Sequence, residues 1–381
     1  MNPIILNSYL QQYKSILDQI KTEVNKITTI NKDLTERENK ILSIQKDISE
    51  IRYQFQLFQS THIAKSNISS TITKLYTLFH EENKQPVSAM LELDDKRIIT
   101  AGEDGSIAVS SIDYRSKQWN IIHLHNNAHD QYINALTKID SSRIISASDD
   151  TKVKIWFINK DNTFTLLKAL TNHTREVRKV LYISNNRFVS SSFDNTVIVW
   201  KIENNNFIQT KVIEEELGPS AMLQLKDKDV VVYPGKINEE KVLMFWDFKT
   251  YKRIHHMNGV FSGSMNGLMQ LPNGLVVSAD GGRAIYIIDP ETYTLLKTIT
   301  NSQYIVYDRK LCSVYLLDGD SFIYVHGNCL CQISIYDYEM LYKVKHQGEL
   351  IGMALLTAKG RYIIANNDHK GLTVYEALAK R

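Results

Sequence analysis

The stretch IISASDDTKVKIW at residues 144–156 decides the fold, because it returns in related form as FVSSSFDNTVIVW at residues 188–200. Each copy contains a short apolar run, a polar turn with Asp, and an alternating run that ends in Trp. Apolar runs on either side of a polar turn are typical of two β-strands joined in a hairpin. A copy without Trp, IITAGEDGSIAVS, occupies residues 98–110. The repeat therefore predicts a mainly β fold in which one strand pair recurs.

Weaker copies continue the repeat toward the C-terminus. Each copy ends 39 to 48 residues after the one before it. One four-stranded propeller blade takes about 40–45 residues. We therefore predict a seven-bladed β-propeller over residues 74–381, preceded by a long α-helical coiled-coil segment. The residues that end the seven copies are Ser110, Trp156, Trp200, Trp246, Ile288, Tyr336 and Tyr375.

The repeats resemble those of the WD-repeat β-propeller family over residues 74–381. The resemblance implies that residues 74–80 supply the closing strand of the last blade. It also implies a hydrogen-bonded relay of His, Ser, Asp and Trp side chains in each well-preserved blade. The relay residues would be His129, Ser146, Asp150 and Trp156 in one blade, and His173, Ser190, Asp194 and Trp200 in the next.

The same His, Ser and Asp residues could suggest a hydrolase triad. The set occurs twice, however, and satisfying a buried indole N–H explains it without chemistry. The sequence also contains no P-loop, no nucleophile elbow and no dinucleotide-binding fingerprint. We therefore predict no enzymatic activity, no catalytic residue, no cofactor and no metal.

The first sixty residues have a different pattern. From Leu6 to Phe58, apolar residues recur in steps of three and four, which is the period of a coiled-coil seam. We predict a coiled-coil helix over residues 1–60 that forms a homo-oligomer through residues 6–58. A helix folded back on the propeller, or a helical hairpin broken near residues 28–31, stays open. Residues 61–73 are predicted to be a linker.

Composition narrows the class of function. The formal net charge is only +3, which does not favour a nucleic-acid partner. The odd number of cysteines, Cys312, Cys329 and Cys331, suits buried thiols in a reducing compartment. The chain shows neither a secretory signal nor a long apolar span, so we expect a cytoplasmic protein without a membrane span.

Function in such a propeller depends on loop side chains at one face of the ring. Exposed aromatic residues in loops are frequent interface anchors, although each could instead cover a neighbouring turn. Six residues beside the predicted relays are the candidates for partner binding. They are Glu103, Tyr132, Asp149, Arg175, Glu176 and Phe193.

The sequence thus predicts a scaffold or adaptor that binds other proteins or peptides through its propeller loops. Two alternatives stay open. One is the substrate-recognition subunit of a ubiquitin ligase, with the ligase supplied by another chain. The other is a component of the cytoskeleton or of vesicle trafficking.

Overall fold

The structure is a computed structural model of the whole chain, and most of its described residues are β-strands and turns. The chain divides into two compact units, Met1–Phe55 and Gln56–Arg381, and each is described by itself. The described residues are 36, 37, 40, 43, 44, 47, 50, 70–79, 87–94, 97–113, 118–258, 261, 265–280, 284–300, 312–317, 320–326, 329–345, 350–356, 361–366 and 371–379.

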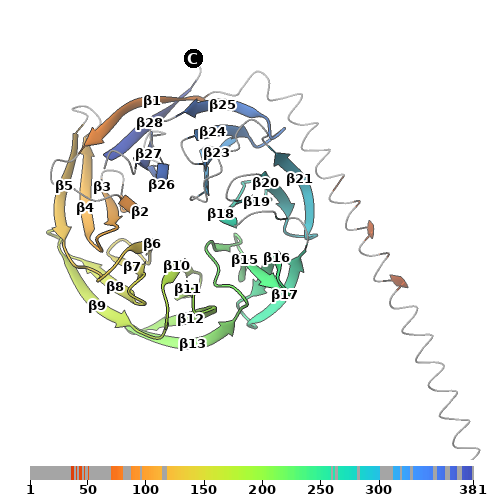
Figure 1. Cartoon of the computed structure of the whole chain (residues 1–381), viewed down its shortest axis with the longest axis horizontal. Coiled ribbons are helices and arrows are strands. Elements are labelled where there is room, and N and C mark those ends of the chain that lie inside the picture. The colour runs from red at the N-terminus through yellow and green to blue at the C-terminus, as the bar shows by residue number, and fades with distance from the viewer. Residues whose placement is uncertain are drawn as a thin grey trace, which may run out of the picture. The chain divides into compact units, whose positions relative to one another are not determined.

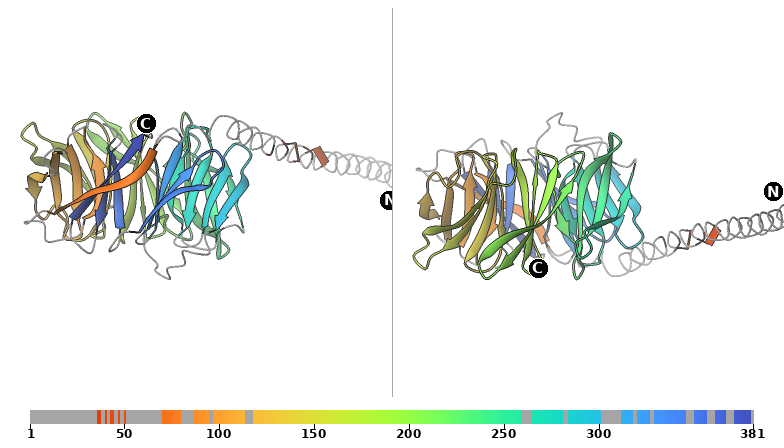
Figure 2. Two further views of the ribbon diagram at one scale, coloured as in Figure 1. Left: turned by 90° about the horizontal axis from the view of Figure 1, so that it is seen from above. Right: turned by 90° about the horizontal axis from the view of Figure 1, so that it is seen from below.

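The second unit is a ring of four-stranded antiparallel sheets (Figure 1). In each sheet from β2 to β25, the strand that comes first in the chain lies nearest the centre of the ring (Figure 1). Seen from the side, the strands run between the two faces of the ring (Figure 2). The first three blades are blade 1, with β2 (Val87–Glu92), β3 (Arg97–Gly102), β4 (Ile107–Asp113) and β5 (Gln118–His125); blade 2, with β6 (Ile133–Lys138), β7 (Arg143–Ser148), β8 (Val153–Ile158) and β9 (Phe164–Leu170); and blade 3, with β10 (Val177–Ile183), β11 (Arg187–Ser192), β12 (Thr196–Glu203) and β13 (Asn206–Glu214).

Three further blades follow the same order. They are blade 4, with β14 (Leu223–Gln224), β15 (Val230–Ile237), β16 (Glu240–Asp247) and β17 (Lys252–Met257); blade 5, with β18 (Met265–Gln270), β19 (Val276–Asp280), β20 (Ala284–Asp289) and β21 (Thr294–Thr300); and blade 6, with β22 (Cys312–Leu316), β23 (Ser321–His326), β24 (Cys329–Ser334) and β25 (Met340–Lys345).

One more sheet joins the two ends of the second unit. It contains β26 (Leu350–Leu356), β27 (Arg361–Asn366), β28 (Gly371–Ala379) and, as its outer strand, β1 (Ser70–Phe79). β1 pairs antiparallel with β28 from Ser70 opposite Ala379 to Phe79 opposite Gly371. The strand thus begins at Ser70, inside the segment expected to be a linker, and not at Lys74.

The predicted fold class needs correction in two respects. First, the seven-bladed propeller is not supported, since side-chain packing is described for six of the seven four-stranded sheets, those from β2 to β25. The described packing therefore supports a mainly β propeller with six blades. The sheet of β26, β27, β28 and β1 is described by its strand pairing alone.

Second, the long coiled-coil segment is not supported, since no helix stands among the described elements. Seven residues between positions 36 and 50 are described, and each of them is helical and exposed. Ile44, a residue of the predicted seam, is 49% exposed. A 3.5-residue period specifies an apolar stripe but does not supply the surface that would cover it. The rest of the predicted segment, including its proposed self-association, lies outside the described residues.

The cores lie between neighbouring sheets, as the alternation of apolar residues requires. Ala135 and Ile145 of blade 2 pack with Val180 and Trp200 of blade 3. Similar clusters join blade 1 to blade 2, blade 3 to blade 4, and blade 4 to blade 5. Blades 2, 3 and 4 are therefore held on both sides, which fixes the loops at their two ends. Within the described part of the chain, no helix has the length and apolar character that crossing a membrane requires.

Candidate protein-interaction face

The relay predicted for blade 2 is assembled in the structure. Trp156 Nε1 donates to Ser146 Oγ at 2.9 Å, and Ser146 Oγ lies 2.7 Å from His129 Nε2. The other ring nitrogen, His129 Nδ1, lies 2.8 Å from Asp150 Oδ2. An indole N–H can only donate, so the serine hydroxyl is free to donate to His129 Nε2. The proton of the neutral imidazole then sits on Nδ1 and is shared with Asp150.

Blade 3 repeats this chain of bonds with almost the same distances. Trp200 Nε1 donates to Ser190 Oγ at 2.9 Å, and His173 lies 2.8 Å from Ser190 Oγ and 2.9 Å from Asp194 Oδ2. Ser146 and Ser190 are both fully buried. A substrate could reach neither hydroxyl, so the geometry suits a structural relay and not a nucleophile.

Burial and hydrogen bonding set the charges of the relay. Burial lowers the pKa of His129 and of His173, and the bonds to the aspartates oppose this only in part. Burial alone would raise the pKa of Asp150, but hydrogen bonds from His129 and from the backbone N–H of Lys152 and Asp130 lower it to about 2. The pKa of Asp194 is lowered in the same way, although burial opposes this. The folded relay therefore holds a neutral histidine beside an ionised aspartate.

The relays hold the turns that carry the candidate residues. We call this end of the ring, with the β3–β4, β7–β8 and β11–β12 turns, the relay face. The backbone N–H of Asp149 donates to Tyr132 O at 2.9 Å, and that of Phe193 donates to Glu176 O at 3.0 Å. Each turn is thereby tied to the loop that precedes its own blade.

Blade 1 joins the same face through Gly105. Its φ of 78° places it in the left-handed region that favours glycine. A Cβ atom there would lie 2.3 Å from the carbonyl oxygen of His129. The backbone N–H of His129 donates to Gly105 O at 2.9 Å. The close approach brings the turn that carries Glu103 against the loop that carries His129 and Tyr132.

Arg178 connects blades 2 and 3 on this face. Its Nη1 donates to Asn134 Oδ1 at 2.7 Å and lies 3.4 Å from Asp149 Oδ1. Asn134 Nδ2 in turn donates to Asp149 Oδ1 at 2.6 Å. The Arg178 guanidinium carbon lies 4.9 Å from the centre of the Phe193 ring, a cation–π distance. Sequence reasoning missed Asn134 and Arg178, although the adjacent charged residues Arg178 and Lys179 in an inner strand were an available signal for Arg178.

Tyr132 lies between these groups. Burial raises its pKa to about 12, the carboxylates of Glu103 and Asp149 also raise it, and Arg178 opposes them. Burial raises the pKa of Glu103 as well. Charges on blades 1, 2 and 3 are thus near enough to act on one phenol. The structure therefore brings Glu103, Tyr132, Asp149 and Phe193 into one strip across three blades.

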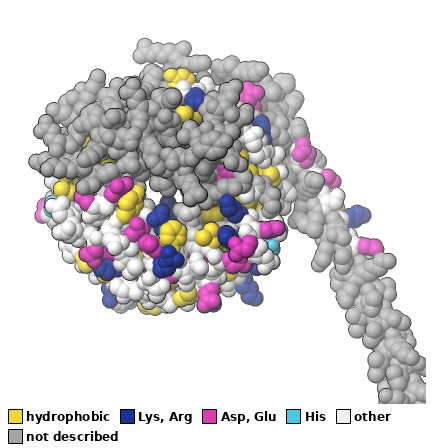
Figure 3. All heavy atoms as spheres, viewed as in Figure 1, with side chains coloured by type: hydrophobic (Ala, Val, Ile, Leu, Met, Phe, Trp, Pro, Cys, Tyr) yellow, Lys and Arg dark blue, Asp and Glu magenta, His cyan; other side chains and the backbone are white. Residues whose placement is uncertain are grey.

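Arg175 and Glu176 stand at the edge of this strip. They form an exposed ion pair, with Arg175 Nε 3.5 Å from Glu176 Oε2. Exposed pairs of this kind contribute only about 0–1 kcal/mol to stability. Arg175 also lies 5.9 Å from the centre of the Phe193 ring. On the part of the ring described in Figure 3, side chains of both signs are interspersed with apolar ones.

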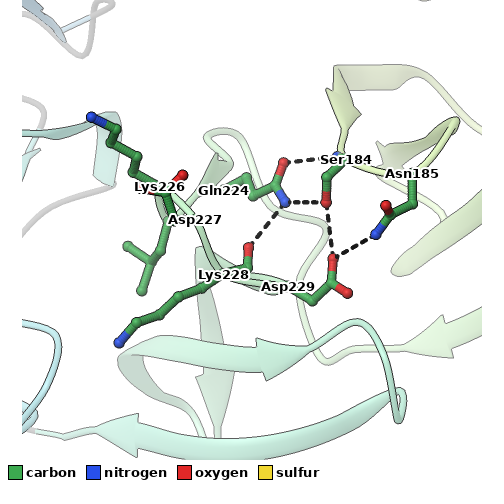
Figure 4. Close-up of a pocket in the computed structure, with 8 residues that line it drawn as sticks. Ser184, Asn185, Gln224, Lys226, Asp227, Lys228 and Asp229 are labelled. Atoms are coloured by element: carbon green, nitrogen blue, oxygen red, sulfur yellow. Dashed lines mark hydrogen bonds between the residues drawn. The ribbon is translucent and has the colours of Figure 1, made fainter.

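A pocket of about 420 Å³ lies at the opposite ends of the strands, between the turns of blades 3 and 4. Gln224 Nε2 donates to Ser184 Oγ at 2.7 Å, and Ser184 Oγ donates to Asp229 Oδ1 at 2.9 Å. Lys226 and Asp227 take no part in the bonds drawn in Figure 4. The lining groups largely satisfy one another, so this pocket is a weaker candidate than the strip.

Comparison with known proteins agrees with this geometry. Residues 121–156 and 164–201 match the family model of the WD domain, G-beta repeat, and each segment contains one complete relay. The chain therefore carries WD repeats, and the predicted resemblance to that family is confirmed to this extent. No curated protein sequence matches the chain.

Among solved structures, the WD40 beta propeller domain of Doa1 has a similar fold. The TM-score is 0.64 at 14% sequence identity, and the match covers 81% of this chain and 97% of that domain. At that identity the likeness shows the fold alone.

Proposed function

We propose that the protein is a non-catalytic scaffold that binds a partner protein through the strip on the relay face. The observation that carries this proposal is the network across three blades, in which half-exposed Tyr132 and Phe193 stand beside Arg178. Tyr and Arg are among the residues that most often dominate binding energy at interfaces. The relays beneath the strip hold it in place before a partner arrives, which lowers the entropy cost of binding.

The test is quantitative affinity capture with the full chain and a double variant, Tyr132→Ala with Phe193→Ala. We expect the strip variant to lose its specific partners by at least about tenfold, since hot-spot truncations cost about 2 kcal/mol or more. The matched control is Phe157→Ala with Tyr182→Ala, which removes the same two ring types from the same two blades. Phe157 is 37% exposed on β8, and Tyr182 lies near the other end of β10. Equal recovery with both variants would exclude the strip as the binding surface.

A further inference from the structure

Lys179 occupies a position that four other sheets give to the smallest residues. It lies on the innermost strand of blade 3, directly after a register shift, and pairs with Ser191. The four residues at the same place in other sheets also follow a register shift and pair with an alanine. They are Ala89, Ala135, Gly267 and Gly352. A lysine at this place is therefore not part of the repeat.

The surroundings of Lys179 do not neutralise its charge. Three other partly buried lysines donate to a backbone carbonyl: Lys138 to Leu93 at 2.6 Å, Lys154 to Ala128 at 2.6 Å, and Lys297 to Asp337 at 2.7 Å. Lys179 makes no such bond and no ion pair to any residue in the described part of the chain. It is partly exposed, yet the protein encloses its ammonium closely enough that burial lowers its pKa.

No carboxylate stands among the described first residues of the inner strands near the relay face. Among the first residues of the seven inner strands, as far as the third, only β10 contributes charged side chains, Arg178 and Lys179. Arg178 is already bonded to Asn134 and lies beside Asp149. The hydroxyl of Ser191, opposite Lys179, donates to Pro219 O at 2.7 Å. The polar side chains of Arg178 and Ser191, next to and opposite Lys179, are thus bonded to other groups.

We propose that Lys179 binds a carboxylate of the partner protein, carried on an acidic segment that reaches the inner wall from the relay face. This inference rests on the proposed function and names the chemistry of the partner at the same face. Lys179 is the third residue of β10 counted from that face, and it remains accessible. A partly desolvated ammonium gains most from an ionised acceptor, because charge-assisted hydrogen bonds are about twice as strong as neutral ones. A small inorganic anion has the same acceptor chemistry, so the experiment separates the two.

The experiment measures binding of a fluorescent hexaglutamate peptide to the full chain by anisotropy at low ionic strength. We expect Lys179→Met to weaken binding at least about tenfold, since it keeps most of the apolar side chain and removes the ammonium group. Lys226→Met is the matched control, because Lys226 is exposed at the pocket on the opposite face. We expect it to leave the affinity within about twofold. Hexalysine should not bind at this site.

Thermal melting of the Lys179→Met variant checks that the variant folds. Lys179→Met should melt no lower than the unmodified chain, since it removes an unpaired, partly buried charge. Equal affinity of hexaglutamate for the chain and for Lys179→Met would overturn the proposal. So would binding of inorganic phosphate that depends on Lys179 while the peptide does not bind. If Lys179→Met retains a partner that the Tyr132 and Phe193 double variant loses, the inference fails and the proposed function stands.

Discussion

Blades 2 and 3 lock their turns in one way and blade 5 in another. In blades 2 and 3, a chain of four side chains runs from a buried indole to an ionised aspartate. In blade 5, buried Asp280 accepts from the backbone N–H of Ala284 at 2.8 Å and from the Tyr286 hydroxyl at 3.0 Å. Both devices satisfy buried polar groups and fix the hairpin. The relay is therefore only one chemical form of a satisfied polar lock in this propeller.

The largest effect should come from breaking a relay at its centre. Ser190→Ala removes the acceptor of the Trp200 indole and the bonding partner of His173 in one step. Leaving two buried groups without partners should cost about 2–4 kcal/mol of unfolding free energy. Denaturant unfolding measures this, with the exposed Ser141→Ala as the control. A cost below that of the control would show that the relay does not hold the blade.

Acid should weaken the relays of blades 2 and 3. The pKa of His129 and of His173 is lower in the folded chain than the ordinary 6.5, so the unfolded chain takes up their protons first. Their contribution to stability is complete above pH 6.5 and is lost as the pH falls below it. Asp150, with a folded pKa of about 2, adds a further loss between about pH 4 and pH 2.

We therefore expect the melting temperature to fall steadily from pH 7 to pH 5. A chain with both His129→Gln and His173→Gln should melt lower at pH 7 and change less over this range. A melting temperature that stays constant in the unmodified chain would contradict the neutral state of the relay histidines. Scanning calorimetry at a series of pH values measures both curves.

A smaller effect is expected from the lock of blade 5. Tyr286→Phe removes one hydroxyl donor from Asp280, while the backbone N–H of Ala284 still donates to the same carboxylate. The expected cost is about 1–2 kcal/mol of unfolding free energy, less than that of Ser190→Ala. Unfolding of the two variants under the same conditions ranks the two devices. A larger loss in blade 5 would reverse the comparison.

The smallest effect should occur at the edge of the strip. Arg175→Gln breaks the exposed pair with Glu176 and should change the unfolding free energy by less than about 0.5 kcal/mol. Thermal unfolding at low and high salt measures the difference. A change above about 1 kcal/mol would mean that the contact of Arg175 with the Phe193 ring stabilises the turn.

Prediction from the sequence succeeded where the pattern is local. The alternating strands and the relay residues of blades 2 and 3 follow from spacing and from one known repeat, and the structure brings those side chains together. The lock of blade 5 was missed because Asp280 and Tyr286 do not follow the relay pattern. Arg178 was missed for another reason, since its partners Asn134 and Asp149 belong to the previous blade. Contacts between blades depend on how the sheets pack, and no local pattern specifies them.

The predicted coiled-coil segment is not supported, because periodicity describes a single helix and says nothing about its partner. The seam residue Ile44 is largely exposed. The start of β1 was placed four residues late because Ser and Thr, read as linker residues, are also compatible with an outer strand. Of the partner-binding candidates, four gather in the strip and two lie at its edge. Their role in binding stays a prediction.

The pairing of β1 with β28 has a consequence during synthesis. Ser70 leaves the ribosome about 300 residues before Ala379, its partner in the sheet. At about 5–20 residues per second, β1 would wait roughly 15 to 60 s with neither edge paired. Throughout that interval it could pair with any other unpaired strand, including one from a neighbouring nascent chain. A chaperone that shields β1 during translation would therefore matter more for the yield of this protein than for its final stability.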